Sequence, residues 1–187
     1  MGFTKEELAR YRDATVPDLI GLETHLLFVG INPGLWTAAT QTHFCHPSNR
    51  FYPALRIAGL IAWTPDTSVG MSEAERAAFT DKGMAITNLV SRATTRASEL
   101  SRQELSVGGE RLKDLVAQLS PRVVAVAGVT AFRTAFGRLE AALGQQDESL
   151  ATAELWVVPN PSGLNAHETV DTLADWYSRV ANAAGIL

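Results

Sequence analysis

Two turns of similar build carry the polar side chains of greatest chemical interest in this sequence. The first, residues 26–34, is a short apolar run that ends in Gly-Ile-Asn-Pro-Gly and contains Asn32. The second, residues 157–165, also follows an apolar run and contains Asn-Pro-Ser-Gly-Leu-Asn. Open α/β sheets hold their ligands beyond the carboxyl ends of the strands, at turns of this kind. The pair therefore predicts one cleft with a turn on either side.

Asn32 is the candidate for chemistry in the first turn. Its neutral amide can orient a water molecule or a substrate group, or it can hydrogen-bond its own turn, and the local pattern fits both readings. The turn lacks the Gly-Lys-Ser/Thr segment of a Walker loop and the three-glycine spacing of a dinucleotide fingerprint. Gly30 and Gly34 permit a close backbone approach around it.

Residues 35–50 are predicted to form a long polar loop that contains aromatic side chains, and such loops are usually functional or disordered. Phe44 lies near its centre and is either the anchor of a small apolar cluster or a stacking platform for a planar ligand. His43 and His46 lack the thiol or carboxylate partners of a typical metal site. We therefore expect no bound metal.

Apolar runs and helical spacings alternate along the chain. Strands are predicted at residues 26–29, 83–90, 123–127 and 155–158, and helices at residues 4–13, 51–61, 72–81, 109–119, 128–137 and 167–184, with a small helical piece and a loop at 138–153. This alternation predicts a three-layer α/β/α fold whose mainly parallel central sheet has about four to five strands. We expect a single domain over residues 1–187.

Composition narrows the class of protein further. No apolar segment is long enough to span a membrane, and the amino terminus lacks a secretory signal. Cys45 is the single cysteine, which excludes an internal disulfide and a cysteine-based cluster and suits a reducing cytoplasm. The net charge of −4 provides no overall basic field for nucleic acid, although a local patch remains open.

Together these motifs resemble the uracil-DNA glycosylase superfamily, and most of all its mismatch-specific uracil/thymine DNA glycosylase branch. Four segments carry the resemblance in the family's order: residues 30–35, 46–51, 84–90 and 160–164. Their order and spacing fit over residues 24–180. The iron–sulfur branches of the superfamily need several cysteines, so the single Cys45 excludes them.

The resemblance implies a role for each matching residue of the pocket. Asn32 would position the water that attacks C1′ of the deoxyribose. Phe44 would stack on the flipped base, and backbone groups of Ile31 and Phe44 would read its edge. Thr37 would border the pocket near the pyrimidine C5 position, and Asn88 would also face the pocket.

The second motif would contact the DNA itself. Ser162 would hold a phosphate, and a wedge of three residues would fill the hole left by the flipped base: Gly163, Leu164 and Asn165. The uracil-specific branch has a His where this chain has Asn160. Residues 91–94 contain no carboxylate, and Ala93 is the position at which an auxiliary acid would stand.

The resemblance implies a monofunctional DNA glycosylase that flips uracil out of double-stranded DNA and hydrolyses its glycosidic bond. G·U mismatches would be preferred, thymine and other damaged pyrimidines would react more weakly, and an abasic site would remain. No metal and no organic cofactor are implied, and a monomer would suffice. A cytoplasmic protein that meets DNA at a bacterial-type nucleoid is expected. The alternatives are a non-catalytic protein that binds mismatched or damaged DNA, and an α/β enzyme acting on nucleosides or nucleotides.

Overall fold

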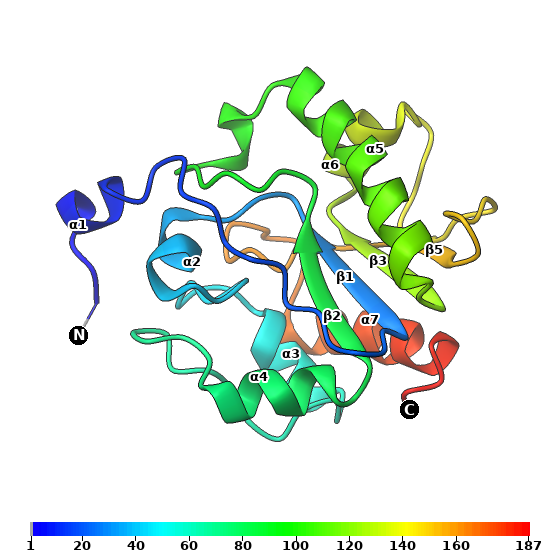
Figure 1. Ribbon diagram of the computed structural model, residues 1–187, viewed down its shortest axis with the longest axis horizontal. Coiled ribbons are helices and arrows are strands. Elements are labelled where there is room, and N and C mark those ends of the chain that lie inside the picture. Colours follow the sequence, from blue (N-terminus) through cyan, green and yellow to red (C-terminus); the bar gives the residue numbers. More distant parts are fainter. Residues whose placement is uncertain (1) are drawn as a thin grey trace.

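A computed structural model describes residues 2–187 as a five-stranded sheet with helices on both faces (Figure 1). The strands are β1 (Leu26–Gly30), β2 (Met84–Asn88), β3 (Val123–Ala127), β4 (Gly144–Gln145) and β5 (Glu154–Val158). They lie in the order β2-β1-β3-β5-β4, and every pair except the antiparallel β4–β5 pair is parallel. The predicted α/β class with a mainly parallel sheet is confirmed.

Two groups of helices cover the sheet. Residues 2–187 contain the α-helices α1 (Lys5–Ala9), α2 (Leu35–Thr40), α3 (Phe51–Ile57), α4 (Glu73–Thr80), α5 (Arg102–Leu119), α6 (Val129–Phe136) and α7 (Val170–Ala183), and the 3-10 helix η1 (Ala97–Glu99). Helices α3, α4 and α7 lie on one face of the sheet, and α5 and α6 lie on the other (Figure 1).

Alternation along β1 shows why its sequence is continuously apolar. Leu26 and Phe28 belong to the core shared with α3 and α7, whereas Leu27 and Val29 belong to the core shared with α5 and α6. Successive side chains of a strand point to opposite faces, so a strand covered on both sides needs apolar residues throughout. All five residues of β1 are buried.

Residues 35–50 are not the uninterrupted loop that the sequence predicted. Residues Leu35–Thr40 form α2, which starts after Gly34 and ends where Gln41 adopts φ 49°. The helix has only six residues, too few for a periodic apolar pattern to identify it. Burial of Ala38 and two threonines stabilises it instead, and only the tertiary structure provides that environment.

Helix α5 begins at Arg102, earlier than the predicted residue 109. A capping box formed by Ser101 and Glu104 starts the helix. Gly108 and Gly109 lie inside it, where glycine is unfavourable by roughly 1 kcal/mol relative to alanine. A Cβ atom at either position would collide with a backbone carbonyl, that of Leu89 or that of Ala135. The glycines thus allow α5 to pack closely against the end of β2 and against α6.

Two further boundaries differ from prediction. Residues 138–153 contain no helix in the structure, and their Gly144–Gln145 segment forms β4 along the free edge of β5. Helix α3 ends at Ile57 instead of residue 61, because Gly59 adopts φ 75°, a left-handed conformation that stops a helix. Neither change alters the edge of the sheet at which the two turns meet.

Candidate functional site

The carboxyl ends of four neighbouring strands frame a cavity of about 330 Å³. Its wall contains residues of both turns, of the loop after α2 and of the loop after β2: Gly30, Ile31, Asn32, Pro33, Gly34, Thr37, His43, Phe44, His46, Ser48, Asn49, Asn88, Thr94, Thr95, Ala97, Ala127, Asn160, Ser162 and Leu164. None of these side chains is a carboxylate, lysine or arginine, so the cavity wall formed by residues 2–187 is polar but uncharged.

Asn32 is held by its amide nitrogen. Nδ2 donates to the carbonyl oxygens of Pro33 (3.1 Å) and Arg92 (3.0 Å) and to the hydroxyl of Thr94 (2.8 Å). Backbone carbonyls only accept, so the amide cannot be turned round without placing oxygen against oxygen. No residue within 2–187 donates to Asn32 Oδ1, which leaves that oxygen as an acceptor at the cavity wall.

The structure shows Asn32 hydrogen-bonded within its own turn, one of the two interpretations left open by the sequence, and leaves Oδ1 available for the other. The bond to Pro33 ties the amide to its own turn, and the bond to Arg92 ties it to the loop after β2. Arg92 is fixed in turn, since its side chain lies 2.6 Å from a Glu104 oxygen and 2.9 Å from an Asp13 oxygen. The guanidinium lowers the pKa of Glu104 to about 2, so this ion pair persists at neutral pH.

Phe44 forms part of the cavity wall and packs on the core. Its ring stacks on Phe51 with 4.3 Å between centroids and 30° between planes. Its backbone has φ 57°, a left-handed conformation that is uncommon outside glycine and often occurs at functional sites. The ring is half-buried and borders the cavity, so both sequence interpretations of Phe44 are compatible with its position.

Ile31, Thr37 and Asn88, to which the resemblance gives roles in the pocket, also line the cavity. Gly30 pairs with Asn88 across the parallel β1–β2 ladder. A Cβ atom at Gly30 would collide with Asn88 Oδ1 and would lie 3.0 Å from the Phe44 ring. A residue without a side chain at the end of β1 thus makes room for two groups of the cavity wall.

The second turn is held together by its own polar groups. Asn160 Oδ1 accepts from the Ser162 N–H (3.0 Å), and its carbonyl oxygen accepts from Asn165 Nδ2 (3.0 Å). Asn160 lines the cavity, and its amide nitrogen remains available as a hydrogen-bond donor there. Leu164 projects beside the cavity with 92% of its surface exposed.

Arg50 fastens the loop that presents Leu164. Its guanidinium donates to three carbonyl oxygens of that loop, those of Gly163 (3.2 Å), Asn165 (3.0 Å) and Glu168 (2.8 Å). Gly163 packs so closely on Ser48 that an added Cβ would lie 2.6 Å from its oxygen atoms. The exposed leucine therefore stands on an anchored loop.

Not every residue singled out in the sequence reaches the cavity. Gly163 and Asn165 flank it without lining it. Ala93 is fully buried in a small apolar cluster with Val16 and Ala38, outside the cavity wall. A carboxylate at position 93 would thus be placed in that cluster and not in the cavity, which argues against Ala93 as the position of an auxiliary acid.

The structure brings to the cavity several side chains to which the sequence assigned no role. Asn160 stands before a proline in the second turn as Asn32 does in the first, and this parallel was a usable signal. His43 and His46 were considered only as metal ligands, yet both ring nitrogens of His43 are engaged by Pro17 and Asn88. Thr94 meets Asn32 through a long-range contact that no local pattern reveals.

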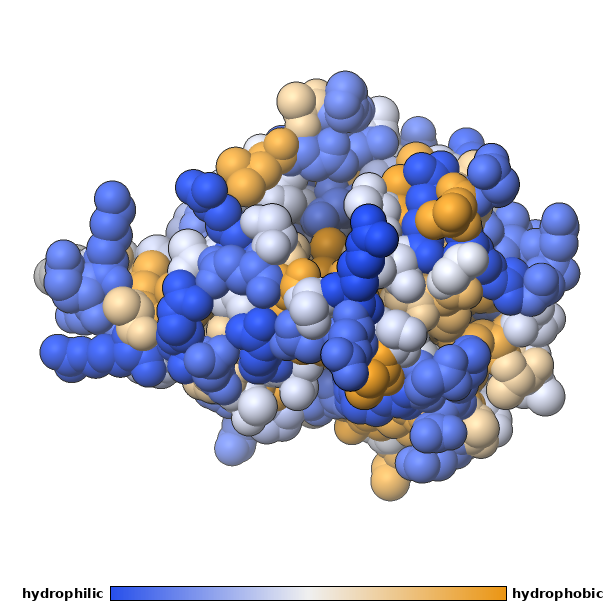
Figure 2. All heavy atoms as spheres, turned by 90° about the horizontal axis from the view of Figure 1, so that it is seen from above, coloured by the Kyte–Doolittle hydropathy of each residue, from blue (hydrophilic) through white to orange (hydrophobic). Residues whose placement is uncertain are grey.

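Other features of the described chain do not point to a second centre. Within residues 2–187 no three histidine, cysteine or acidic side chains come together as metal ligands. None of the helices in that range combines the length and apolar content needed to cross a membrane. On the face shown in Figure 2, hydrophilic residues predominate and apolar ones form small separate groups.

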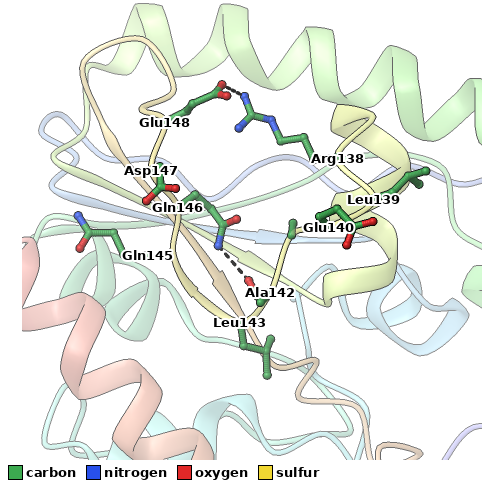
Figure 3. A pocket seen from close by; sticks show the side chains of 10 residues that line it. Arg138, Leu139, Glu140, Ala142, Leu143, Gln145, Gln146, Asp147 and Glu148 are labelled. Atoms are coloured by element: carbon green, nitrogen blue, oxygen red, sulfur yellow. Dashed lines mark hydrogen bonds and ion pairs between the residues drawn. The ribbon is translucent and has the colours of Figure 1, made fainter.

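A larger hollow of about 450 Å³ lies in residues 138–148 (Figure 3). A single local segment forms it, closed by an ion pair between Arg138 and Glu148 and by a hydrogen bond from Gln146 to the carbonyl oxygen of Ala142 (2.9 Å). None of its residues comes from the two turns. Size alone therefore does not identify the functional site.

Fold and site together define a class: an α/β protein with an uncharged, amide-bearing pocket at the carboxyl edge of its sheet and an apolar side chain beside it. The model of the uracil DNA glycosylase superfamily matches residues 17–184, and the chain therefore belongs to that superfamily. Members of the superfamily are DNA glycosylases, which are hydrolases.

A solved structure supports the fold assignment. The chain is similar to a Methanosarcina acetivorans protein studied by solution NMR and provisionally described as a uracil DNA glycosylase. The two share 17% sequence identity over 90% of this chain and 96% of that chain, with a TM-score of 0.56. At this identity the likeness concerns the fold, and neither comparison assigns the chain to the mismatch-specific branch.

Proposed function

We propose that this protein is a monofunctional uracil-DNA glycosylase that flips uracil out of double-stranded DNA, with a preference for G·U mismatches. The base must leave the stack before its glycosidic bond can be reached, and mismatched bases leave at the lowest cost. The cavity of about 330 Å³ beside an aromatic ring is suited to one planar base.

The free oxygen of Asn32 carries the proposal. An amide fixed through its nitrogen offers Oδ1 to a water, which it orients toward C1′ of the deoxyribose. The C1′–N1 bond breaks, its electron pair leaves with the base, the water oxygen bonds to C1′ and the water proton passes to solvent. A neutral amide is a poor general base, so the rate depends on how well the base carries negative charge.

Asn160 supports the departing base in this scheme. Its oxygen is engaged by Ser162, so its amide nitrogen is the group left to donate to a carbonyl oxygen of the leaving base. Such donors stabilise charge that develops in the transition state. Uracil is a better leaving group than thymine in this scheme, and we expect the same order of rates.

Leu164 and its loop act on the duplex. An exposed apolar side chain can enter the base stack and fill the space of the flipped nucleotide, as wedge residues do in proteins that kink DNA. Anchoring by Arg50 lowers the entropy lost when the loop enters the stack. Ser162 belongs to the same turn, and in this scheme it holds a DNA phosphate.

Base release from a labelled duplex with a single G·U pair tests the function. Strand cleavage that appears only after alkali would establish a monofunctional glycosylase. We expect this result because the cavity wall has no lysine that could form a Schiff base and cut the strand without alkali. Asn32→Ala should lower release by about 100-fold or more and leave duplex affinity largely intact. Unchanged release by this variant would remove Asn32 from the mechanism.

The uncharged cavity wall favours one alternative function, a protein that binds lesions without cutting them. The same duplex separates the two: retention of the intact G·U duplex without release supports lesion binding. Absence of both binding and release would contradict both readings.

A further inference from the structure

His43 is a buried polar residue that the proposed reaction does not use. Its side chain is only 3% exposed, although it belongs to the cavity wall. Ring atom Nε2 lies 2.9 Å from the carbonyl oxygen of Pro17, and Nδ1 lies 3.0 Å from Nδ2 of Asn88. The ring thus links the segment before β1 to the end of β2.

The Pro17 contact determines where the ring proton lies. A backbone carbonyl can only accept, so Nε2 of His43 carries the hydrogen. Burial lowers the pKa of His43 below the ordinary value of 6.5, so the ring is neutral at pH 7. Its Nδ1 then has only a lone pair, and the group of Asn88 that faces it must be the NH2 group.

This arrangement directs the other half of the Asn88 amide toward the cavity. Oδ1 and the Phe44 ring both lie within about 3 Å of the place that a Cβ atom of Gly30 would occupy. Among residues 2–187 nothing donates a hydrogen bond to this oxygen. The end of β2 therefore presents an unpaired acceptor to whatever occupies the pocket.

We propose that His43 is a positioning residue that locks Asn88 with its carbonyl oxygen toward the cavity, so that the pocket selects a base with a ring N–H at that edge. The inference rests on the proposed function and names the feature of the base that is read. Uracil offers such a donor at N3, cytosine has a bare acceptor there, and N3-methyluracil offers neither. A base that leaves this buried acceptor unpaired should react roughly 10- to 100-fold more slowly.

Protonation of His43 reverses the orientation of the Asn88 amide. A hydrogen on Nδ1 requires an acceptor, so the Asn88 amide must turn its oxygen to the ring and its NH2 group to the cavity. The carboxylate of Asp18 favours the protonated ring and the guanidinium of Arg76 opposes it, while the Tyr52 hydroxyl donates to the His43 carbonyl. His46 is the other titratable side chain of the cavity wall. Acidification should therefore remove the preference for an N3–H donor.

Three variants test whether His43 orients the Asn88 amide. His43→Asn keeps an acceptor near the position of Nδ1 but cannot titrate, and His43→Leu has no acceptor. His46→Gln measures how much of any pH dependence comes from the second histidine. The readout is the ratio of single-turnover release of uracil to that of N3-methyluracil between pH 5 and 9.

We expect the wild-type ratio to be at least about 10 above pH 7 and to fall in acid. His43→Asn should keep the ratio at every pH, and His43→Leu should lower it about 10-fold. A His43→Leu variant with the full ratio would overturn the proposal. If the duplex is bound but not cut, the same ratio is measured from affinities. If uracil duplexes are neither bound nor cut, the inference is rejected together with the proposed function.

If the His43→Leu variant does not fold, a direct measurement on the wild-type protein tests the role of His43. Nitrogen-15 NMR of the histidine rings distinguishes the two neutral tautomers. His43 should carry its proton on Nε2 at pH 7, as its contact with Pro17 requires. A proton on Nδ1 at that pH would overturn the assignment.

Discussion

Replacement of Asn32 by aspartate should slow the enzyme, although aspartate is the stronger base. The substitution places an oxygen where Nδ2 now donates to the carbonyl oxygens of Pro33 and Arg92, at 3.1 and 3.0 Å. Neither carbonyl can donate in return. The third partner, the Thr94 hydroxyl, already donates its hydrogen to the Arg96 carbonyl oxygen (2.8 Å). The new carboxylate therefore faces three oxygen atoms and gains no donor.

The magnitude follows from these contacts. Two lost hydrogen bonds, with both carbonyls left facing a like partner, cost roughly 2–4 kcal/mol in the free energy of unfolding. For a chain of this length that corresponds to a decrease in Tm of about 5–15 °C. Proton uptake by the carboxyl relieves part of the repulsion, which raises its pKa and removes its capacity as a base. Release of uracil at pH 7 should thus fall about 10-fold or more.

Single-turnover release from a G·U duplex between pH 5 and 9, with a thermal melt at each pH, measures both effects. Asn32→Ala is the control, because it removes the amide without adding an oxygen and should lose activity with a smaller change in Tm. An aspartate variant that is faster than wild type at pH 7 and equally stable would refute the orientation assigned to Asn32.

Four other predictions concern the surroundings of the cavity. Leu164→Ala should slow release from duplex about 10-fold more than release from single strands, and equal losses on both would reject the wedge role. Arg50→Ala should give the same duplex-selective loss through a loosened loop, with Arg50→Lys as the matched charge control. Ala93→Asp should lower stability by about 3 kcal/mol or more without any gain in rate, because it buries an unpaired carboxylate; a faster variant would contradict this. Stability should fall with pH below about 6.5, since the pKa of His43 is lower in the folded than in the unfolded chain; urea titrations should show a smaller fall for His43→Asn.

Local patterns in the sequence are sufficient to predict the architecture and the edge of the sheet at which the two turns meet. Continuous apolar runs such as residues 26–29 predict strands covered on both faces, and capping boxes such as that at Ser72 mark the starts of helices. Because parallel strands end at one edge, two polar turns that follow strands had to meet there. The prediction of one cleft with a turn on either side follows from these local rules.

Local rules failed where stability comes from distant partners. Helix α2 forms because Ala38 and its neighbours are buried, and α5 tolerates Gly108 and Gly109 because the backbone of Leu89 and that of Ala135 lie against them. A periodic pattern within one segment contains no information about such contacts. For the same reason the burial of Ala93 could not be predicted, because its apolar cluster is formed by segments far apart in the sequence.

The directions of the polar groups in the cavity wall depend on contacts between segments that are far apart in the sequence. The sequence names the asparagines, but the carbonyls of Pro33 and Arg92 determine which end of the Asn32 amide is free. The carbonyl of Pro17, acting through His43, likewise determines which end of Asn88 faces the pocket. The physical reason is that an amide carries a donor and an acceptor of nearly equal size, so its direction is set by the partners that the fold brings to it.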